Sequence, residues 1–224
     1  MCGRYVAPDE AAIEREFNLV RVEWQFPESY NVAPTQSVPA VRLEAGVPTA
    51  RLLRWGLIPF FAAGVPPKYS TINARMETVR SSASYRGPWS RGQRCLVPAR
   101  GFYEWQVQPD GRKIPHYLHL NDQEIFAFAG LWDRSRRADG AIVESFTLIT
   151  LPANTLLREI HNTQYRMPAI LAREAREIWL AGSPDEAWAV LAPYPEAHMV
   201  AWPVSTRVNK PQNNDSSLIA PLAA

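Results

Sequence analysis

The stretch that decides the fold class runs from residue 38 to residue 55 and reads Val38-Pro39-Ala40-Val41-Arg42-Leu43-Glu44-Ala45-Gly46-Val47-Pro48-Thr49-Ala50-Arg51-Leu52-Leu53-Arg54-Trp55. Residues 38–43 and 49–55 alternate between apolar and polar side chains, as strands with one buried face do. Turn-forming residues 46–48 separate them. The stretch therefore predicts a β-hairpin.

The same pattern recurs along the chain. We expect further strands over residues 2–6, 95–107 (followed by a turn at 109–111), 115–120, 125–131, 145–150 and 200–208. Short helices are expected over residues 9–17, with Asp9 as N-cap, and over 154–160, 173–180 and 185–191. Strands outnumber helices and follow one another directly. This order predicts an α+β fold with a mainly antiparallel, barrel-like β-sheet core, in a single domain over residues 1–224.

Composition limits the classes of protein to which the chain can belong. The formal net charge of the 224 residues is only +2, so any nucleic-acid-binding surface must be local. Two cysteines are too few for a disulfide framework, and Cys95, inside an apolar run, is expected to be a structural thiol. No signal peptide and no apolar run of membrane-spanning length is visible. We therefore expect a cytoplasmic monomer with no membrane association.

The chain begins Met1-Cys2-Gly3-Arg4. Removal of Met1 leaves Cys2 with an α-amine and a thiol on adjacent carbons, whose ordinary pKa values are about 7.7–8.0 and about 8.5. Such a pair condenses with an aldehyde to an imine and then a thiazolidine; alternatively, the thiol attacks a carbonyl with the amine as its base. The competing interpretation is that Cys2 is simply a buried residue of a terminal strand.

Two further polar groups stand in informative surroundings. Asn73 is expected to open a helix, where its amide either caps the helix or orients a nucleophile or an oxyanion. Arg75 beside it can grip a phosphate. Glu104 lies between large aromatic residues in a predicted strand and shares a face with Phe102. It is either solvated or held in an apolar pocket that raises its pKa and suits it to proton transfer.

His161 ends a predicted helix, where it either interacts with the helix dipole or serves as an acid or base near neutral pH. The histidines show no metal-ligand spacing with the cysteines, so neither a metal site nor another cofactor is expected. Phe60 and Phe61 close an aromatic segment that is core in part. If exposed beside arginines, they form a stacking platform for unpaired bases.

These pieces occur in a fixed order that resembles the SRAP (SOS response-associated peptidase) family over essentially the whole chain. The motifs are Met-Cys-Gly-Arg at 1–4, Asn-Val-Ala-Pro-Thr at 31–35, Arg-Trp-Gly-Leu-Ile-Pro at 54–59, Asn-Ala-Arg-Met-Glu-Thr at 73–78, Arg-Cys-Leu-Val-Pro-Ala at 94–99, Gly-Phe-Tyr-Glu-Trp at 101–105, Ala-Gly-Leu-Trp at 129–132, Ile-His at 160–161, Arg-Met-Pro at 166–168 and Val-Ser-Thr-Arg-Val-Asn at 204–209.

The resemblance implies an enzyme that shields abasic sites in single-stranded DNA through a lyase-like activity that forms a cross-link with the DNA. It also implies that the peptidase activity in the family name is the removal of the protein's own Met1. It implies that the processed Cys2 forms a covalent thiazolidine with the ring-opened abasic sugar. By the same resemblance, Asn73 positions the cysteine and the sugar, and Glu104 transfers protons. His161 assists ring opening of the sugar. The implied DNA contacts are Arg4, Arg75, Arg166, Thr150, Phe60 and Phe61.

Two features depart from the family pattern. The family commonly has one residue between the histidine and Arg-Met-Pro, whereas four residues separate His161 from Arg166. We expect this segment to bulge if both residues keep their places. The family also often carries tryptophan after Ile-Pro, where Phe60 and Phe61 stand here. A phenylalanine still stacks, and aromatic stacking contributes roughly 1–3 kcal/mol per base.

Two other functions remain open from the residues alone. Class II glutamine amidotransferases, which are N-terminal nucleophile amidohydrolases, also begin Met-Cys-Gly and use the thiol on an amide. A non-covalent reader of modified DNA would need no cysteine chemistry. Release of glutamate without DNA would favour the first, and DNA binding that survives Cys2→Ala without any adduct would favour the second.

Overall fold

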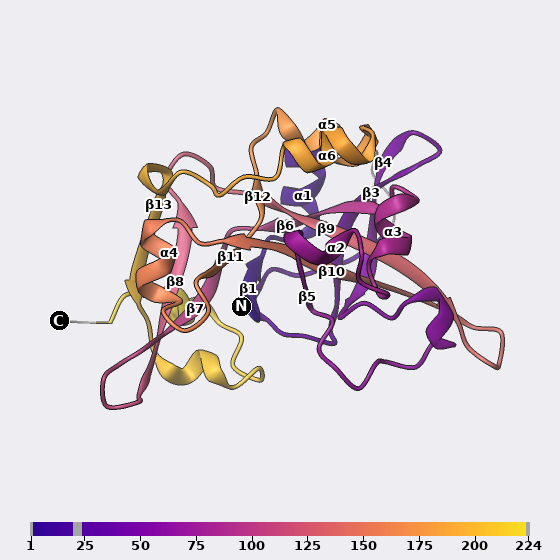
Figure 1. The fold of residues 1–224 in the computed structure, drawn as a ribbon. Helices are drawn as coiled ribbons and strands as arrows, with labels where there is room; N and C mark the ends of the chain where they lie inside the picture. The colour runs from indigo at the N-terminus through magenta and orange to yellow at the C-terminus, as the bar shows by residue number, and fades with distance from the viewer. Residues whose placement is uncertain (1, 20–23, 223–224) are drawn as a thin grey trace.

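A computed structural model describes residues 2–19 and 24–222 of the chain. Two β-sheets make up its centre, and short helices lie around them (Figure 1). The first sheet has the strand order β13-β8-β7-β1-β2, and every neighbouring pair in it is antiparallel. Its strands are β1 (Arg4–Ala7), β2 (Ser29–Val32), β7 (Gly101–Val107), β8 (Lys113–Leu120) and β13 (Met199–Pro203).

The second sheet closes on itself. Its strand order is β11-β10-β4-β3-β6-β9-β12, and β9 also pairs with β10, so β10, β4, β3, β6 and β9 form a closed barrel. Only the pairings of β10 with β4 and with β5 are parallel among the described strands. The strands are β3 (Ser37–Glu44), β4 (Val47–Trp55), β5 (Asn73–Arg75), β6 (Arg94–Ala99), β9 (Phe126–Arg136), β10 (Ile142–Pro152), β11 (Arg166–Pro168) and β12 (Ile170–Leu171). The expected mainly antiparallel, barrel-like α+β fold is confirmed.

The predicted hairpin is β3 and β4, in register from Ser37 opposite Arg54 to Glu44 opposite Val47. Its turn is tighter than expected, because Val47 already belongs to the strand. Ala45 and Gly46 alone make the turn, with φ angles of 49° and 81°. Positive φ at both central residues is the geometry that matches the twist of the flanking strands.

Within the described residues, six short α-helices surround the sheets: α1 (Glu10–Phe17), α2 (Met76–Val79), α3 (Arg86–Ser90), α4 (Thr155–Ile160), α5 (Ala175–Ala181) and α6 (Pro184–Ala189). The same part of the chain contains four 3-10 turns: η1 (Phe60–Ala62), η2 (Glu196–His198), η3 (Thr206–Asn209) and η4 (Ser216–Ile219). Asp9 caps α1 as predicted, since its Oδ1 accepts a hydrogen bond of 2.7 Å from the backbone N–H of Ala12. The expected strand over 200–208 is wrong beyond residue 203, where η3 replaces it.

Aromatic side chains join the two sheets into one core. The ring of Tyr5, on β1, meets Trp55 on β4 edge-on with centroids 5.4 Å apart, and Phe128 on β9 with centroids 5.9 Å apart. Edge-to-face contacts of this kind add to the burial of apolar surface. The start of β1 is therefore held firmly against the barrel, which positions the residue that precedes the strand.

Among residues 2–19 and 24–222, none of the helices is long and apolar enough to cross a membrane.

Candidate active site

Cys2 lies just before β1 and is completely buried. The Asn73 side chain reaches it: Asn73 Nδ2 donates a hydrogen bond of 2.8 Å to the Cys2 carbonyl oxygen. Asn73 does not open a helix, so that expectation is wrong; it lies in β5, opposite Leu148 of β10, and α2 begins only at Met76. Asn73 therefore fixes the backbone of Cys2 directly.

The Cys2 thiol is a poor acid in this environment. Burial raises its pKa well above the ordinary value, and the nearby Glu104 carboxylate raises it further. Its Sγ lies 3.7 Å from the Arg4 carbonyl oxygen, an acceptor for the S–H group. At neutral pH the thiol stays protonated, so its use as a nucleophile requires a neighbouring proton acceptor.

Glu104 can supply that acceptor. Its side chain is only 2% exposed, and burial raises its pKa from an ordinary value of 4.5 to about 7. The solvated alternative is therefore wrong. Strand alternation explains the burial: Phe102, two residues earlier on the same face, packs on Phe128 of the barrel, whereas Tyr103 points to the other face and packs on Tyr117. A carboxyl group with a pKa near 7 can both donate and accept protons at neutral pH.

His161 is the residue that ends α4, and it is buried. Its Nδ1 lies 2.9 Å from the Arg166 carbonyl oxygen and 3.3 Å from the Arg166 backbone nitrogen. Both contacts lie at Nδ1, so the Arg166 backbone fixes the orientation of the imidazole ring. Burial lowers the pKa of His161, which keeps the ring neutral at pH 7.

The four residues between His161 and Arg166 bulge as expected. Tyr165 has a φ of 55°, and its backbone N–H donates to the His161 carbonyl oxygen at 3.0 Å, which closes a turn. Asn162 holds the segment on β7: its side-chain amide accepts from the Val107 N–H at 3.0 Å and donates to the Val107 carbonyl at 2.8 Å. The longer segment is thus ordered, and Arg166 still begins β11 beside the histidine.

Arg166 is buried and already engaged. Its guanidinium forms an ion pair with Glu77 and donates to the Thr150 carbonyl oxygen at 2.6 Å. Thr150 itself has no exposed surface, and its hydroxyl donates to the Ala74 carbonyl oxygen at 3.4 Å. The side chain of Thr150 therefore supports Arg166 and does not reach the surface, contrary to its predicted DNA contact. The pairing of Glu77 with Arg166 has no signal in the sequence, because 89 residues separate the two.

The other candidate DNA contacts lie nearer the surface. Arg75 is exposed at the end of β5, and Arg4 is half-buried, with its Nη1 donating to the Gly3 carbonyl at 2.8 Å. Phe60 and Phe61 in η1 are 57% and 55% exposed and meet edge-to-face. Both rings are thus available for stacking, whereas Trp55, Leu57 and Ile58 before them are core.

Residues that the sequence did not single out hold Phe60 in place. The buried Asp133 accepts the Phe60 backbone N–H at 2.9 Å and pairs with Arg91 at 3.1 Å. The Arg91 guanidinium in turn lies over the Phe60 ring, 5.2 Å from its centroid. Asp133 directly follows the Ala-Gly-Leu-Trp motif, and this position is the signal that could have indicated it.

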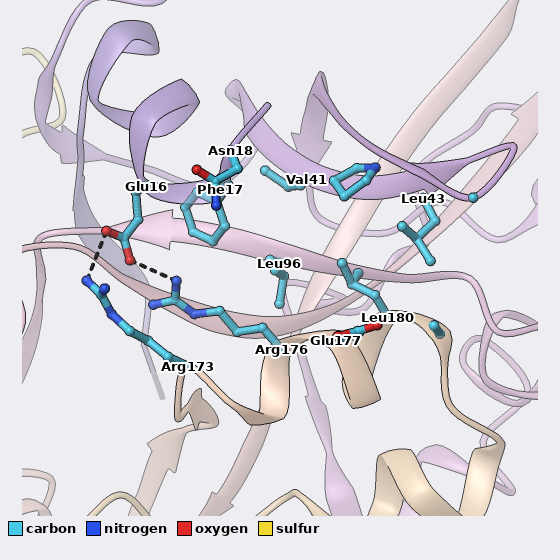
Figure 2. A pocket seen from close by; sticks show the side chains of 13 residues that line it. Glu16, Phe17, Asn18, Val41, Leu43, Leu96, Arg173, Arg176, Glu177 and Leu180 are labelled. Carbon is cyan, nitrogen blue, oxygen red and sulfur yellow. Dashed lines mark hydrogen bonds and ion pairs between the residues drawn. The ribbon is translucent and has the colours of Figure 1, made fainter. Parts of the chain in front are cut away.

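A cavity of about 440 Å³ adjoins Glu104 and His161, so the structure brings these two predicted residues to one space. A larger cavity, of about 590 Å³, lies elsewhere, between α1, the β3–β4 hairpin and α5 (Figure 2). There Glu16 is paired with Arg173 at 3.0 Å and with Arg176 at 2.8 Å, as Figure 2 shows. Opposite charges cancel in that cavity and none of the four predicted catalytic residues lines it, so the smaller cavity is the candidate site.

The described part of the chain holds no cluster of three or more histidine, cysteine, aspartate or glutamate side chains able to bind a metal ion. Both cysteines are free and buried. The reactive side chains near the start of β1 and the smaller cavity are Cys2, Glu104 and His161, and Asn73 is hydrogen-bonded to the Cys2 backbone.

The chain is similar to known proteins over its whole length. The sequence model of the family SOS response associated peptidase (SRAP) matches residues 1–211. The abasic site processing protein YoaM of Bacillus subtilis is 36% identical, over 98% of this chain and 97% of that protein. The abasic site processing protein HMCES of Gallus gallus is 33% identical, over 99% of this chain and 78% of its own length. A crystal structure of a Bacteroides thetaiotaomicron protein superposes with a TM-score of 0.89 at 28% identity, covering 100% of both chains. The ordered motifs, the barrel fold and these similarities together show that the chain belongs to the SRAP family.

Proposed function

We propose that this protein captures abasic sites in single-stranded DNA by forming a thiazolidine between processed Cys2 and the ring-opened sugar. The observation that carries the proposal is the environment of Cys2: Asn73 holds its carbonyl at 2.8 Å while the buried Glu104 acts electrostatically on its thiol. An abasic sugar exposes an aldehyde, which is the electrophile that an adjacent amine and thiol capture. The relatives described above are named abasic site processing proteins, which supports the same substrate.

The raised pKa of the Cys2 thiol favours an order of steps in which the amine reacts first. After loss of Met1, the α-amine adds to C1′ of the sugar aldehyde, and the resulting hydroxyl leaves as water with a proton from Glu104. The nitrogen then returns its proton to the Glu104 carboxylate, and the product is an imine. The thiol sulfur then adds to C1′ while its proton passes through Glu104 to the ring nitrogen. The balance is one aldehyde and one aminothiol converted to one thiazolidine and one water.

His161 acts before these steps. An abasic sugar exists mainly as a closed hemiacetal, so its C1′ hydroxyl must lose a proton as the bond between C1′ and O4′ breaks. A neutral His161, whose ring is oriented by the Arg166 backbone, can take that proton and deliver it to O4′, which leaves as the C4′ hydroxyl. Glu104 and His161 together thus supply an acid and a base at one cavity.

DNA binding rests on phosphate contacts in this proposal. Arg4 and Arg75 contact phosphates directly, and Phe60 and Phe61 stack on unpaired bases. Arg166 stays paired with Glu77 beneath the surface and makes no direct phosphate contact. Since a missing base offers no edge to hydrogen-bond, sequence specificity is low, and two direct contacts give a log–log salt slope of about −1.4 on single strands.

The decisive experiment mixes the protein, shown by mass spectrometry to lack Met1, with abasic single-stranded DNA on a denaturing gel. A shifted band is expected, lost in Cys2→Ala and kept in Cys95→Ala, a matched control because both thiols are free and buried. Absence of a band from the processed parent protein would overturn the proposal. Release of glutamate from glutamine without DNA would instead indicate the amidohydrolase. We also expect Glu104→Gln to slow adduct formation or its reversal, and unchanged rates in both directions would remove Glu104 from the mechanism.

A further inference from the structure

The cavity beside Glu104 and His161 is larger than the reacting groups need. Its volume of about 440 Å³ falls within the range of small-molecule sites, about 300–1,000 Å³. Besides the two catalytic candidates, its lining includes Trp105, Lys113, Thr163, Gln164 and Asn209. None of these five residues has a role in the chemistry proposed above.

One wall is built by the segment that exceeds the family spacing. Thr163 and Gln164 lie in the turn between His161 and Arg166, and Asn162 anchors that turn to Val107 of β7 through two hydrogen bonds. The extra residues therefore do not form a loose loop; they place a hydroxyl and an amide at the rim of the cavity.

A second wall is held by the last residue of η3. Trp105 Nε1 donates a hydrogen bond of 2.8 Å to Asn209 Oδ1. The oxygen of the Asn209 amide is therefore engaged, and its NH₂ group is the part that can donate to a ligand. The neighbours of Asn209 are fixed too, because the buried Asn31 Nδ2 donates to the carbonyl oxygens of Val208 and Lys210, each at 3.1 Å. Asn209 thus lines the cavity from a clamped stretch of backbone.

The charge of the lining points to an anion. Lys113 is the one permanently charged cation among the described lining residues, and Thr163, Gln164 and Asn209 add uncharged donors. The only acid among them is Glu104, whose raised pKa of about 7 leaves much of it uncharged at neutral pH. A group with several acceptor oxygens and a full negative charge, such as a phosphate, matches such a lining.

We propose that this cavity binds a phosphate adjoining the abasic sugar, with Lys113 as its charged contact. This inference rests on the proposed function, because only a sugar that reaches Glu104 and His161 brings its own phosphate within reach of Lys113. The site then favours an abasic sugar that still carries its flanking phosphate.

The test measures binding of single-stranded DNA that contains a tetrahydrofuran abasic analogue. This analogue has no aldehyde, so the outcome is independent of whether the covalent reaction occurs. Lys113→Gln is expected to make the slope of the logarithm of the binding constant against the logarithm of the salt concentration less negative by about 0.7. Over a fourfold rise in salt, the affinity of this variant for the DNA would then fall about threefold less than that of the parent protein. The control is Arg112→Gln, which removes one charge from the next residue; Arg112 is ion-paired with Asp110 and does not line the cavity.

A second measurement identifies the phosphate. A neutral methylphosphonate replaces, one at a time, the phosphate on either side of the analogue. One of the two replacements is expected to weaken binding to the parent protein and to Arg112→Gln but to have no further effect on Lys113→Gln. An unchanged salt slope in Lys113→Gln, an equal change in Arg112→Gln, or a methylphosphonate effect that persists in Lys113→Gln would overturn the assignment.

Discussion

Replacement of Glu104 by glutamine tests the electrostatics of the site most directly. The folded protein raises the pKa of this carboxyl from 4.5 to about 7 through burial, so folding disfavours its ionised form. Between these two pH values the folded state binds more protons than the unfolded state, and stability therefore falls as pH rises. Because one pKa unit corresponds to 1.36 kcal/mol, the loss is about 3 kcal/mol once the pH exceeds 7.

Glutamine has nearly the shape of the protonated acid and cannot ionise. We therefore expect Glu104→Gln to exceed the free energy of unfolding of the parent protein by only about 1 kcal/mol at about pH 5 but by about 3 kcal/mol at about pH 8. Urea denaturation at both pH values measures this difference. His161 acts in the opposite sense, because its lowered pKa costs stability as pH falls below about 6.5. This contribution is common to both proteins and cancels in the comparison.

Glu196→Gln is the matched control, since Glu196 is exposed in η2. It is expected to change the free energy of unfolding equally at both pH values. The reasoning is refuted if the difference between Glu104→Gln and the parent protein is the same at both pH values, because burial would then not disfavour the ionised carboxylate. The role of Glu104 in proton transfer would lose its physical basis with it.

Three further changes probe the DNA platform, the buried arginine and the clamp on η3. Phe60→Ala should weaken binding of single-stranded DNA by roughly 1–3 kcal/mol in fluorescence anisotropy, with the adduct rate at saturating DNA unchanged; equal affinity would exclude stacking. Glu77→Gln leaves the Arg166 guanidinium without its carboxylate and should lower the melting temperature, an effect that Glu196→Gln should lack. Asn31→Ala removes the donor shared by three backbone carbonyls and should cost roughly 1–3 kcal/mol in urea denaturation; an unchanged midpoint would contradict the clamp.

Much of the architecture could be predicted because it depends on local pattern. The β3–β4 hairpin, the cap at Asp9 and the separation of Phe102 and Glu104 from Tyr103 by strand alternation all follow from neighbouring residues. Two errors had local causes as well. Asn73 has the residue type and position of a helix cap, and residues after 203 have strand-forming composition, yet pairing with β10 and the 3-10 turn η3 prevailed.

The catalytic candidates could be named from the ordered motifs, but their states could not. Whether Glu104 is solvated or buried depends on what packs over its face of β7, and there Phe102 packs on Phe128 of the barrel. In the same way, the sequence predicts that Arg166 contacts DNA, whereas in the fold its guanidinium is paired with Glu77, 89 residues away.

Residue types and their order along the chain therefore identify the chemistry at Cys2: an amine and a thiol on adjacent carbons, released by loss of Met1. Periodicity and turn residues likewise identify the strands. Folding decides the protonation states, because desolvation and distant partners set the pKa values of Cys2, Glu104 and His161. Folding also creates the cavity beside Glu104, since its walls come from segments near residues 104–113, 161–164 and 209 that only the tertiary structure brings together.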